Sequence, residues 1–368
     1  MRKQSYPRAF WRLLQAASTA ACLSAAVLAQ VGPATGRIAY IEPAGALKIQ
    51  QRKRASFADA TVGMIVRRGY MLDLAPGARA IVKCADGKPY QLQPGFRPCP
   101  CVALAQGALY RIYGEPRTGG ADTAAKNFPV VISPRRTRLL TTRPTIRWSP
   151  VAPRPDEAPI KYLVGVYTEK MRRVWEREVT SLTELEYPAQ EPALTRGEVY
   201  LVLVETEGRS SDEEGTAGRG FTVLTDEEAQ AVNAAESGVR GLNLPTTGTE
   251  FLVADLYAAR GLSSEAIDKL TALKDDLNHP WVLIMFGDLY AAASLHREAI
   301  AQYKSALALP RGENDLEARA LALTVLGRSY LSVGEFREAD AIFHAAMRAY
   351  RKLGVKKSMR QLKEGTLK

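Results

Sequence analysis

The cysteines are the residues best suited to chemistry in this chain, and their spacing favours a disulfide over a metal site. Cys84, Cys99 and Cys101 lie close together in the sequence. In an oxidising compartment we expect one bridge from Cys84 to either Cys99 or Cys101, which leaves one thiol over. Closing a loop of about 15 residues stabilises a small domain by roughly 3 kcal/mol in the chain-entropy model. A metal site would need further ligands, and the histidines lie far along the chain: His279, His296 and His344.

The other polar residues show no arrangement typical of an active site. An enzyme usually needs paired acid–base groups, a nucleophile beside its base, or a set of metal ligands, and the sequence offers none of these patterns. The pair Gly119-Gly120 lacks the Lys-Ser that completes a phosphate loop, and the acidic run at 210–215 lacks the alternating oxygen ligands of a calcium loop. We therefore expect a non-enzymatic protein with no cofactor and no bound metal.

The beginning of the chain has the layout of a secretory signal peptide. Basic residues precede an uncharged, largely apolar run over residues 13–29, and Ala29 offers a cleavage point. A retained membrane anchor is the alternative, although the run is short for a span of about 20 residues. A lipoprotein modified at Cys22 is a further alternative, although the leucine usual shortly before such a cysteine is missing. We expect a periplasmic, secreted or envelope protein with no membrane span after cleavage.

The charge of the chain is positive and unevenly distributed. The formal net charge is +11, and without residues 1–29 the chain holds 46 basic and 39 acidic residues. Residues 30–126 hold 14 basic against 6 acidic residues, and a second basic concentration lies in the tail at 351–368. Such patches attract anionic envelope polymers, phospholipid head groups or an acidic protein face, or they form a solvated surface. We expect no nucleic-acid binding, because export removes that partner and aromatic residues do not interleave with the basic clusters.

The C-terminal region repeats itself over residues 251–350. The copies align on three alanines, each of which follows a glutamate: Ala266, Ala299 and Ala339. In every copy a small residue stands twelve positions before the alanine and a tyrosine stands nine positions before it. Small residues at this spacing let the two helices of a hairpin approach closely. The tight turns between the helices are expected at equivalent positions: Gly261, Ser294 and Gly334.

This pattern resembles the tetratricopeptide repeat, whose period is about 34 residues. The resemblance implies stacked antiparallel helix pairs with a groove that binds a segment of a protein partner. Groove-lining residues are expected on the first helix of each pair, three positions before and one position after its small residue. These candidate partner-binding residues, chosen by helical spacing, are Phe251, Asp255, Ile284, Asp288, Thr324 and Arg328.

The region at residues 36–113 alternates short apolar runs with turn signals, which predicts a small all-β roll or barrel. Its motifs are a glycine-led strand at 69–72, a glycine–alanine hairpin at 77–82, and a turn at Asp86-Gly87. They are similar to the FecR-type β domain of bacterial envelope proteins. The resemblance implies a binding or scaffolding module outside the cytoplasm that carries no catalytic residues.

Residues 128–225 contain a series of short candidate strands, which is typical of an immunoglobulin-like or fibronectin-like sandwich. Trp148 ends an early strand, where a buried core tryptophan is common. Leu194 precedes Tyr200, and this tyrosine opens a long apolar strand. The pattern resembles the tyrosine corner of fibronectin type III domains, whose hydroxyl bonds the backbone at the strand crossing. We therefore expect both aromatic residues to be structural.

The fold class predicted for the whole chain is multidomain, with β modules first and helices afterwards. A capping box at residues 225–228 predicts a helix from Asp226 to about Glu236, which would cover the N-terminal end of the helical stack. The expected parts are a signal peptide (1–29), a FecR-like all-β domain (30–113), a linker (114–127), a fibronectin- or immunoglobulin-like β-sandwich (128–225), a capping helix and linker (226–248), a solenoid of three tetratricopeptide repeats (249–350) and a basic helix or tail (351–368).

These features favour an exported, non-enzymatic scaffold or adaptor that binds a protein partner through its repeat groove in the bacterial cell envelope. One alternative is an envelope sensor that acts through the FecR-like domain on a membrane regulator. Another alternative is a protein that binds cell-wall or other envelope polysaccharide through the domain at residues 30–126.

Overall fold

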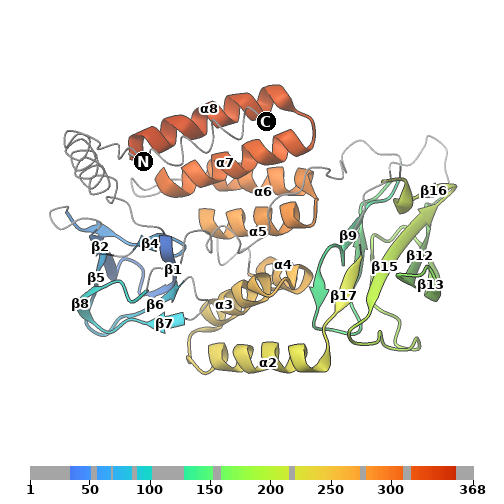
Figure 1. The fold of residues 1–368 in the computed structure, drawn as a ribbon, viewed down its shortest axis with the longest axis horizontal. Helices are drawn as coiled ribbons and strands as arrows, with labels where there is room; N and C mark the ends of the chain where they lie inside the picture. Colours follow the sequence, from blue (N-terminus) through green and yellow to red (C-terminus); the bar gives the residue numbers. More distant parts are fainter. Residues whose placement is uncertain are drawn as a thin grey trace, which may run out of the picture.

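A computed structural model gives the structure of this chain and places a stack of helices between two β domains (Figure 1). It describes residues 34–50, 56–67, 69–84, 89–101, 128–151, 159–214, 220–273, 279–309 and 316–353. The expected signal peptide, the Asp86-Gly87 turn, the linker and most of the basic tail lie outside these ranges. Small antiparallel sheets followed by helical hairpins confirm the predicted fold class.

The N-terminal β domain consists of two four-stranded antiparallel sheets, ordered β4-β1-β6-β7 and β3-β2-β5-β8. Alternate residues of β2 and β5 are buried, because successive side chains of a strand point to opposite faces of its sheet. Most buried residues of both sheets belong to one apolar cluster, so the sheets share a core. The strands are β1 (Ala34–Glu42), β2 (Leu47–Gln50), β3 (Ala58–Asp59), β4 (Ile65–Arg67), β5 (Met71–Leu74), β6 (Arg79–Cys84), β7 (Pro89–Gln91) and β8 (Gly95–Pro98).

A disulfide joins Cys84 to Cys101, which is one of the two pairings that the sequence allowed. The bridge ties the end of β6 in one sheet to the chain just after β8 in the other sheet. Its two cysteines lie 17 positions apart, and a loop of that length is expected to add about 3 kcal/mol of stability. Cys99 is not part of this disulfide and is partly buried.

The middle domain has two facing sheets, ordered β10-β17-β15-β12-β13 and β14-β11-β9, with β16 paired to β15. Trp148 is buried between them beside Tyr162, with 5.6 Å between the ring centroids, so its predicted core position is confirmed. The elements are β9 (Val131–Ser133), β10 (Arg138–Leu139), β11 (Ile146–Trp148), β12 (Lys161–Thr168), β13 (Arg173–Thr180), β14 (Glu184–Leu185), β15 (Val199–Thr206), β16 (Arg209–Ser210), the 3-10 helix η2 (Ser211–Glu214) and β17 (Phe221–Val223).

The predicted tyrosine corner is also present in the middle domain. The Tyr200 hydroxyl accepts a hydrogen bond of 2.9 Å from the backbone N–H of Thr195, and Leu194 is buried beside it. This hydrogen bond joins the start of β15 to the backbone that leads into it. Tyr200 therefore has the structural role that its position in the sequence indicated.

Seven helices follow within the described residues: α2 (Asp226–Arg240), α3 (Thr246–Ala259), α4 (Ser263–Ala272), α5 (Pro280–Ala292), α6 (His296–Ala308), α7 (Leu316–Ser332) and α8 (Phe336–Leu353). The capping box at Thr225 and Glu228 is confirmed, and α2 continues four residues beyond the predicted Glu236. This helix packs along α3 at one end of a stack of three antiparallel pairs, namely α3/α4, α5/α6 and α7/α8.

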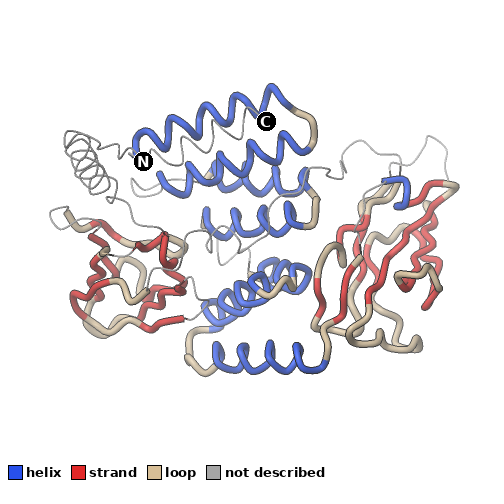
Figure 2. The backbone as a smooth tube through the Cα atoms, in the orientation of Figure 1, coloured by secondary structure: helices blue, strands red, loops and turns tan. Residues whose placement is uncertain are grey.

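The small residues of the repeat allow the close helix packing that the sequence predicted. A Cβ atom built on Gly287 would lie 2.2 Å from the ring of Tyr303, and one built on Gly327 would lie 2.8 Å from the ring of Phe343. Both aromatic rings come from the second helix of the same pair. The three predicted turn residues all have positive φ angles, of 76° for Gly261, 61° for Ser294 and 81° for Gly334. Figure 2 shows the three turns at the same end of the helical stack.

Candidate protein-binding site on the helical stack

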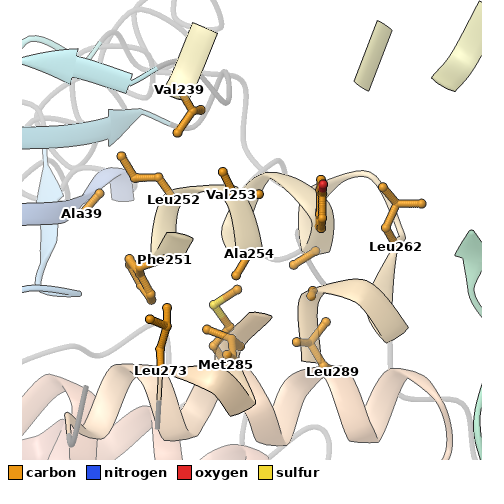
Figure 3. Packing of buried hydrophobic residues seen from close by; sticks show 14 of the residues in the cluster. Ala39, Val239, Phe251, Leu252, Val253, Ala254, Leu262, Leu273, Met285 and Leu289 are labelled. Carbon is orange, nitrogen blue, oxygen red and sulfur yellow. The ribbon is translucent and has the colours of Figure 1, made fainter. Parts of the chain in front are cut away.

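The six residues predicted to line a groove lie on α3, α5 and α7, and we call the face that these helices share the inner face. At the first helix pair this face is covered by the chain's own N-terminal β domain. Lys83 on β6 forms an ion pair with Asp255 on α3, and both side chains are largely buried. Phe251 is buried in an apolar cluster that also contains Ala39 of β1 (Figure 3) and Ile81 of β6. Two of the predicted partner-binding residues are thus engaged within the molecule.

At the second helix pair the β domain packs on the start of α5. The guanidinium of Arg37 lies 5.0 Å from the centroid of the Trp281 ring, which places a cation over its face. Gly63 touches the same tryptophan so closely that a Cβ atom there would lie 2.2 Å from the indole Cγ. A glycine at this position lets the backbone of the β domain reach the helix. Trp281 is consequently buried.

Asp288 on α5 is the predicted site residue with the most perturbed chemistry. Burial raises its pKa to about 6, against the opposing effects of the Tyr303 hydroxyl, Arg37 and Arg328. The hydroxyl donates a hydrogen bond of 2.7 Å to the carboxylate, and burial raises the pKa of Tyr303 well above its ordinary range. The carboxylate is therefore hydrogen-bonded to Tyr303 of α6, and the nearby charges of Arg37 and Arg328 favour its ionised form.

Of the remaining predicted residues, two are buried and one is partly exposed. Ile284 is buried in the apolar cluster of the second and third helix pairs. Thr324 is buried, and its hydroxyl donates a hydrogen bond of 2.8 Å to the Ala320 carbonyl within α7. Arg328 is partly exposed. Of the six predicted residues, Arg328 is therefore the one that lies best placed for an outside partner.

The α7 stripe, which we define as Leu321, Val325 and Arg328, continues the covered surface of the first two pairs. In the repeat register these residues are equivalent to Trp281, Met285 and Asp288 on α5 and to Gly248, Leu252 and Asp255 on α3. All three members of the α7 stripe are partly exposed. The stripe also reverses a charge, because an arginine stands where the first two pairs carry an aspartate.

Sequence reasoning missed the residues of the β domain that cover the inner face. Besides Arg37 and Lys83, Arg79 donates hydrogen bonds of 2.9 Å to the carbonyls of Leu242 and Asn243 just after α2. The basic excess of residues 30–126 was the available signal. Part of that charge is directed at the helices of the same chain.

The middle domain contacts the turns within the helix pairs through residues 133–140, which we call the clasp segment. At the turn between α3 and α4, the Arg138 N–H donates to the Gly261 carbonyl at 2.9 Å, and the Thr137 hydroxyl accepts from the Ser263 N–H at 2.9 Å. Leu262 before α4 makes no side-chain capping bond, so Thr137 caps this helix from another domain. The Leu140 N–H donates to the Glu265 carboxylate at 2.7 Å.

The clasp segment also binds the second turn, between α5 and α6. The buried Arg135 donates through Nε to the Ala293 carbonyl at 2.7 Å, and Arg136 bonds the Ser294 hydroxyl. Ala293 and Leu295 share a small apolar cluster with Val130 of the middle domain. Both β domains thus hold the first two helix pairs, one on the inner face and the other at the turns.

Two of the acidic groups described above pair with groups of another domain: Asp255 pairs with Lys83, and Glu265 accepts the Leu140 N–H. Within the described residues, no group of three or more His, Cys, Asp or Glu side chains is placed to hold a metal ion. In the same part of the chain, no helix combines the length and the hydropathy needed to cross a bilayer. The disulfide is typical of an oxidising compartment.

No protein-family model matches the sequence, and no curated protein matches it either.

Proposed function

We propose that this chain is a non-enzymatic scaffold or adaptor that works outside the cytoplasm, in the bacterial cell envelope or as a secreted protein. Its helix pairs resemble tetratricopeptide repeats, its first β domain resembles FecR-type domains, and its middle domain resembles fibronectin type III sandwiches. The disulfide and the signal-like N-terminal sequence support the location.

The observation that carries this proposal is that the inner face already binds the N-terminal β domain of the same molecule. Two of the three helix pairs already bind a folded protein surface there, through buried apolar side chains and the pairing of Lys83 with Asp255. The same face continues onto α7, where the stripe is partly exposed. A surface that recognises protein at two levels is well suited to recognise protein at a third level.

The partner that fits the α7 stripe is a protein segment with an apolar side and an acidic residue. Leu321 and Val325 offer apolar area that is partly packed against the third helix pair. Arg328 offers a cation, which binds carboxylates well because its planar fork donates two parallel hydrogen bonds. An acidic partner would therefore match the basic α7 stripe, as the basic β domain matches the aspartates of the first two helix pairs.

Site-specific photocrosslinking in the cells that make the protein tests this proposal. A photoreactive residue at Val325 should capture a discrete envelope protein, and the variant Arg328→Glu should abolish that capture. A photoreactive residue at Ala341, on the exposed face of α8, serves as the position control, and Arg337→Glu serves as the charge control. Capture that persists in Arg328→Glu, or equal capture from both positions, would count against the proposal.

A second candidate function is the binding of envelope polysaccharide by the N-terminal β domain. Phe57 and Phe96 form an exposed edge-to-face pair with 5.6 Å between ring centroids, and they are 41% and 54% exposed. Exposed aromatic rings offer apolar faces on which sugar rings can pack. Co-sedimentation with insoluble envelope polysaccharide should be lost in Phe96→Ala and retained in Met171→Ala, an equally exposed apolar site in the middle domain. Equal sedimentation of the two variants would exclude this function.

A further inference from the structure

The three turns of the helix pairs have the same backbone geometry, but the clasp segment binds two of them. The residue after each turn donates its N–H to a tyrosine carbonyl, at 2.9 Å for Leu262, 2.9 Å for Leu295 and 3.0 Å for Glu335. The central residue has positive φ in all three turns. The third turn, between α7 and α8, is thus a structural copy of two turns that have protein ligands.

The side chains at the third turn are apolar and exposed where their counterparts are covered. Phe336 occupies the position of His296 in the repeat register; Phe336 is 69% exposed, whereas His296 is 0% exposed. Leu331, four positions after the small residue of α7, is 36% exposed, whereas its counterpart Ala291 is buried. Apolar side chains exposed together beside an existing interface indicate a further binding surface.

The polar groups of the third turn match those that bind the clasp segment. Glu338 is equivalent to Glu265, whose carboxylate accepts the Leu140 N–H, and Glu338 is exposed. Val333 is equivalent to Ala293, whose carbonyl accepts a hydrogen bond from an arginine of the clasp segment. The third turn can therefore offer a carboxylate to a backbone N–H and a carbonyl to a guanidinium.

We propose that the third turn binds an arginine-bearing segment of a partner protein in the manner of the clasp segment. The clasp segment cannot reach this turn in its own molecule, because it is already bonded to the first two turns. The same engagement removes it as a donor from a second copy of the chain. This surface is separate from the α7 stripe on the inner face, so either proposal can fail while the other holds.

A peptide with the sequence of residues 131–141 provides a defined probe, because it contains the clasp segment and its three arginines. Fluorescence anisotropy of the labelled peptide with the full chain should show saturable binding. Phe336→Asp should weaken this binding at least about tenfold, which corresponds to about 1.4 kcal/mol. A peptide in which the arginines are replaced by alanine should bind at least about tenfold more weakly to the wild type.

Matched controls keep the outcome decisive. Met171→Asp changes an exposed apolar residue of the middle domain and should leave the peptide affinity unchanged. Circular dichroism verifies that Phe336→Asp folds, which its exposure leads us to expect. The absence of saturable binding, or binding that Phe336→Asp leaves intact, would overturn the proposal. So would a change of oligomeric state in Phe336→Asp, since that would assign the surface to a second copy.

Discussion

Replacing Gly63 by alanine should separate the docking of the N-terminal domain from its internal stability. Gly63 has a φ angle of +85°, and a Cβ atom there would lie 2.2 Å from Trp281 Cγ. The left-handed backbone costs an alanine roughly 1–2 kcal/mol. Overpacking against a buried ring adds about 1–3 kcal/mol. Gly63→Ala should therefore lower the free energy of unfolding by roughly 2–5 kcal/mol.

Gly45→Ala is the matched control for this variant. Gly45 has a φ angle of +80° in the same domain, and nothing lies within 4 Å of a Cβ atom built there. The control should cost roughly 1–2 kcal/mol for the backbone alone. Urea unfolding of the full chain, followed by circular dichroism, measures both variants.

A second-site change shows whether the clash with Trp281 is the cause. Trp281→Gly removes both the ring and its Cβ, which lies 2.3 Å from the position that a Cβ atom on residue 63 would take. In that background Gly63→Ala should cost no more than Gly45→Ala, a coupling of about 1–3 kcal/mol. Equal costs of Gly63→Ala and Gly45→Ala in the wild-type background would refute the interface as described.

Three further predictions concern single contacts. Burial raises the pKa of Glu265 to about 7, above its ordinary 4.5. The stability that this group contributes is therefore complete below about pH 4.5 and is lost as the pH rises through about 7. In Glu265→Gln the midpoint of thermal unfolding should depend less on pH between pH 5 and 8. Cys84→Ser should lower the free energy of unfolding by about 3 kcal/mol, and a reductant should do the same to the wild type but not to the variant. Tyr200→Phe should cost about 1 kcal/mol in urea unfolding, because the Thr195 N–H loses its acceptor.

Local rules were sufficient to predict much of the fold. The turn residues, the capping box at Thr225 and the hydroxyl bond of Tyr200 each depend on residues a few positions apart, and all three are confirmed. The close approach of Gly287 to Tyr303 followed from a repeat, because equivalent positions must serve equivalent contacts. The repeat therefore allowed contacts expected within one helix pair to be predicted for the other pairs.

The docking of the β domains lay beyond such reasoning, because it joins residues that no period connects. Lys83 and Asp255 are 172 positions apart, and nothing local links them. One signal was nevertheless present at the start of α4, where Leu262 precedes the helix and cannot cap it. A helix without a local cap indicates that another segment supplies one, and here Thr137 does so.

Helical spacing could not predict which residues of the chain itself cover the candidate site. Helical spacing placed Asp255 and Asp288 on the inner face, and it also placed Arg328 there. It could not show that the molecule's own basic β domain covers the first two levels. Whether one domain covers a face of another depends on the shapes of both folded domains, and residue spacing along one helix does not describe these shapes.

The distance along the chain between Lys83 and its aspartate has a consequence for biogenesis. The N-terminal segment is synthesised long before the helices on which its sheets rest, so its contact face can be covered only after those helices have been made and have folded. Contacts between such remote segments form late, because the intervening chain must first give up its freedom. Arg37 and Tyr40 are therefore expected to gain their final protection from hydrogen exchange after the sheets and the helix pairs have each formed.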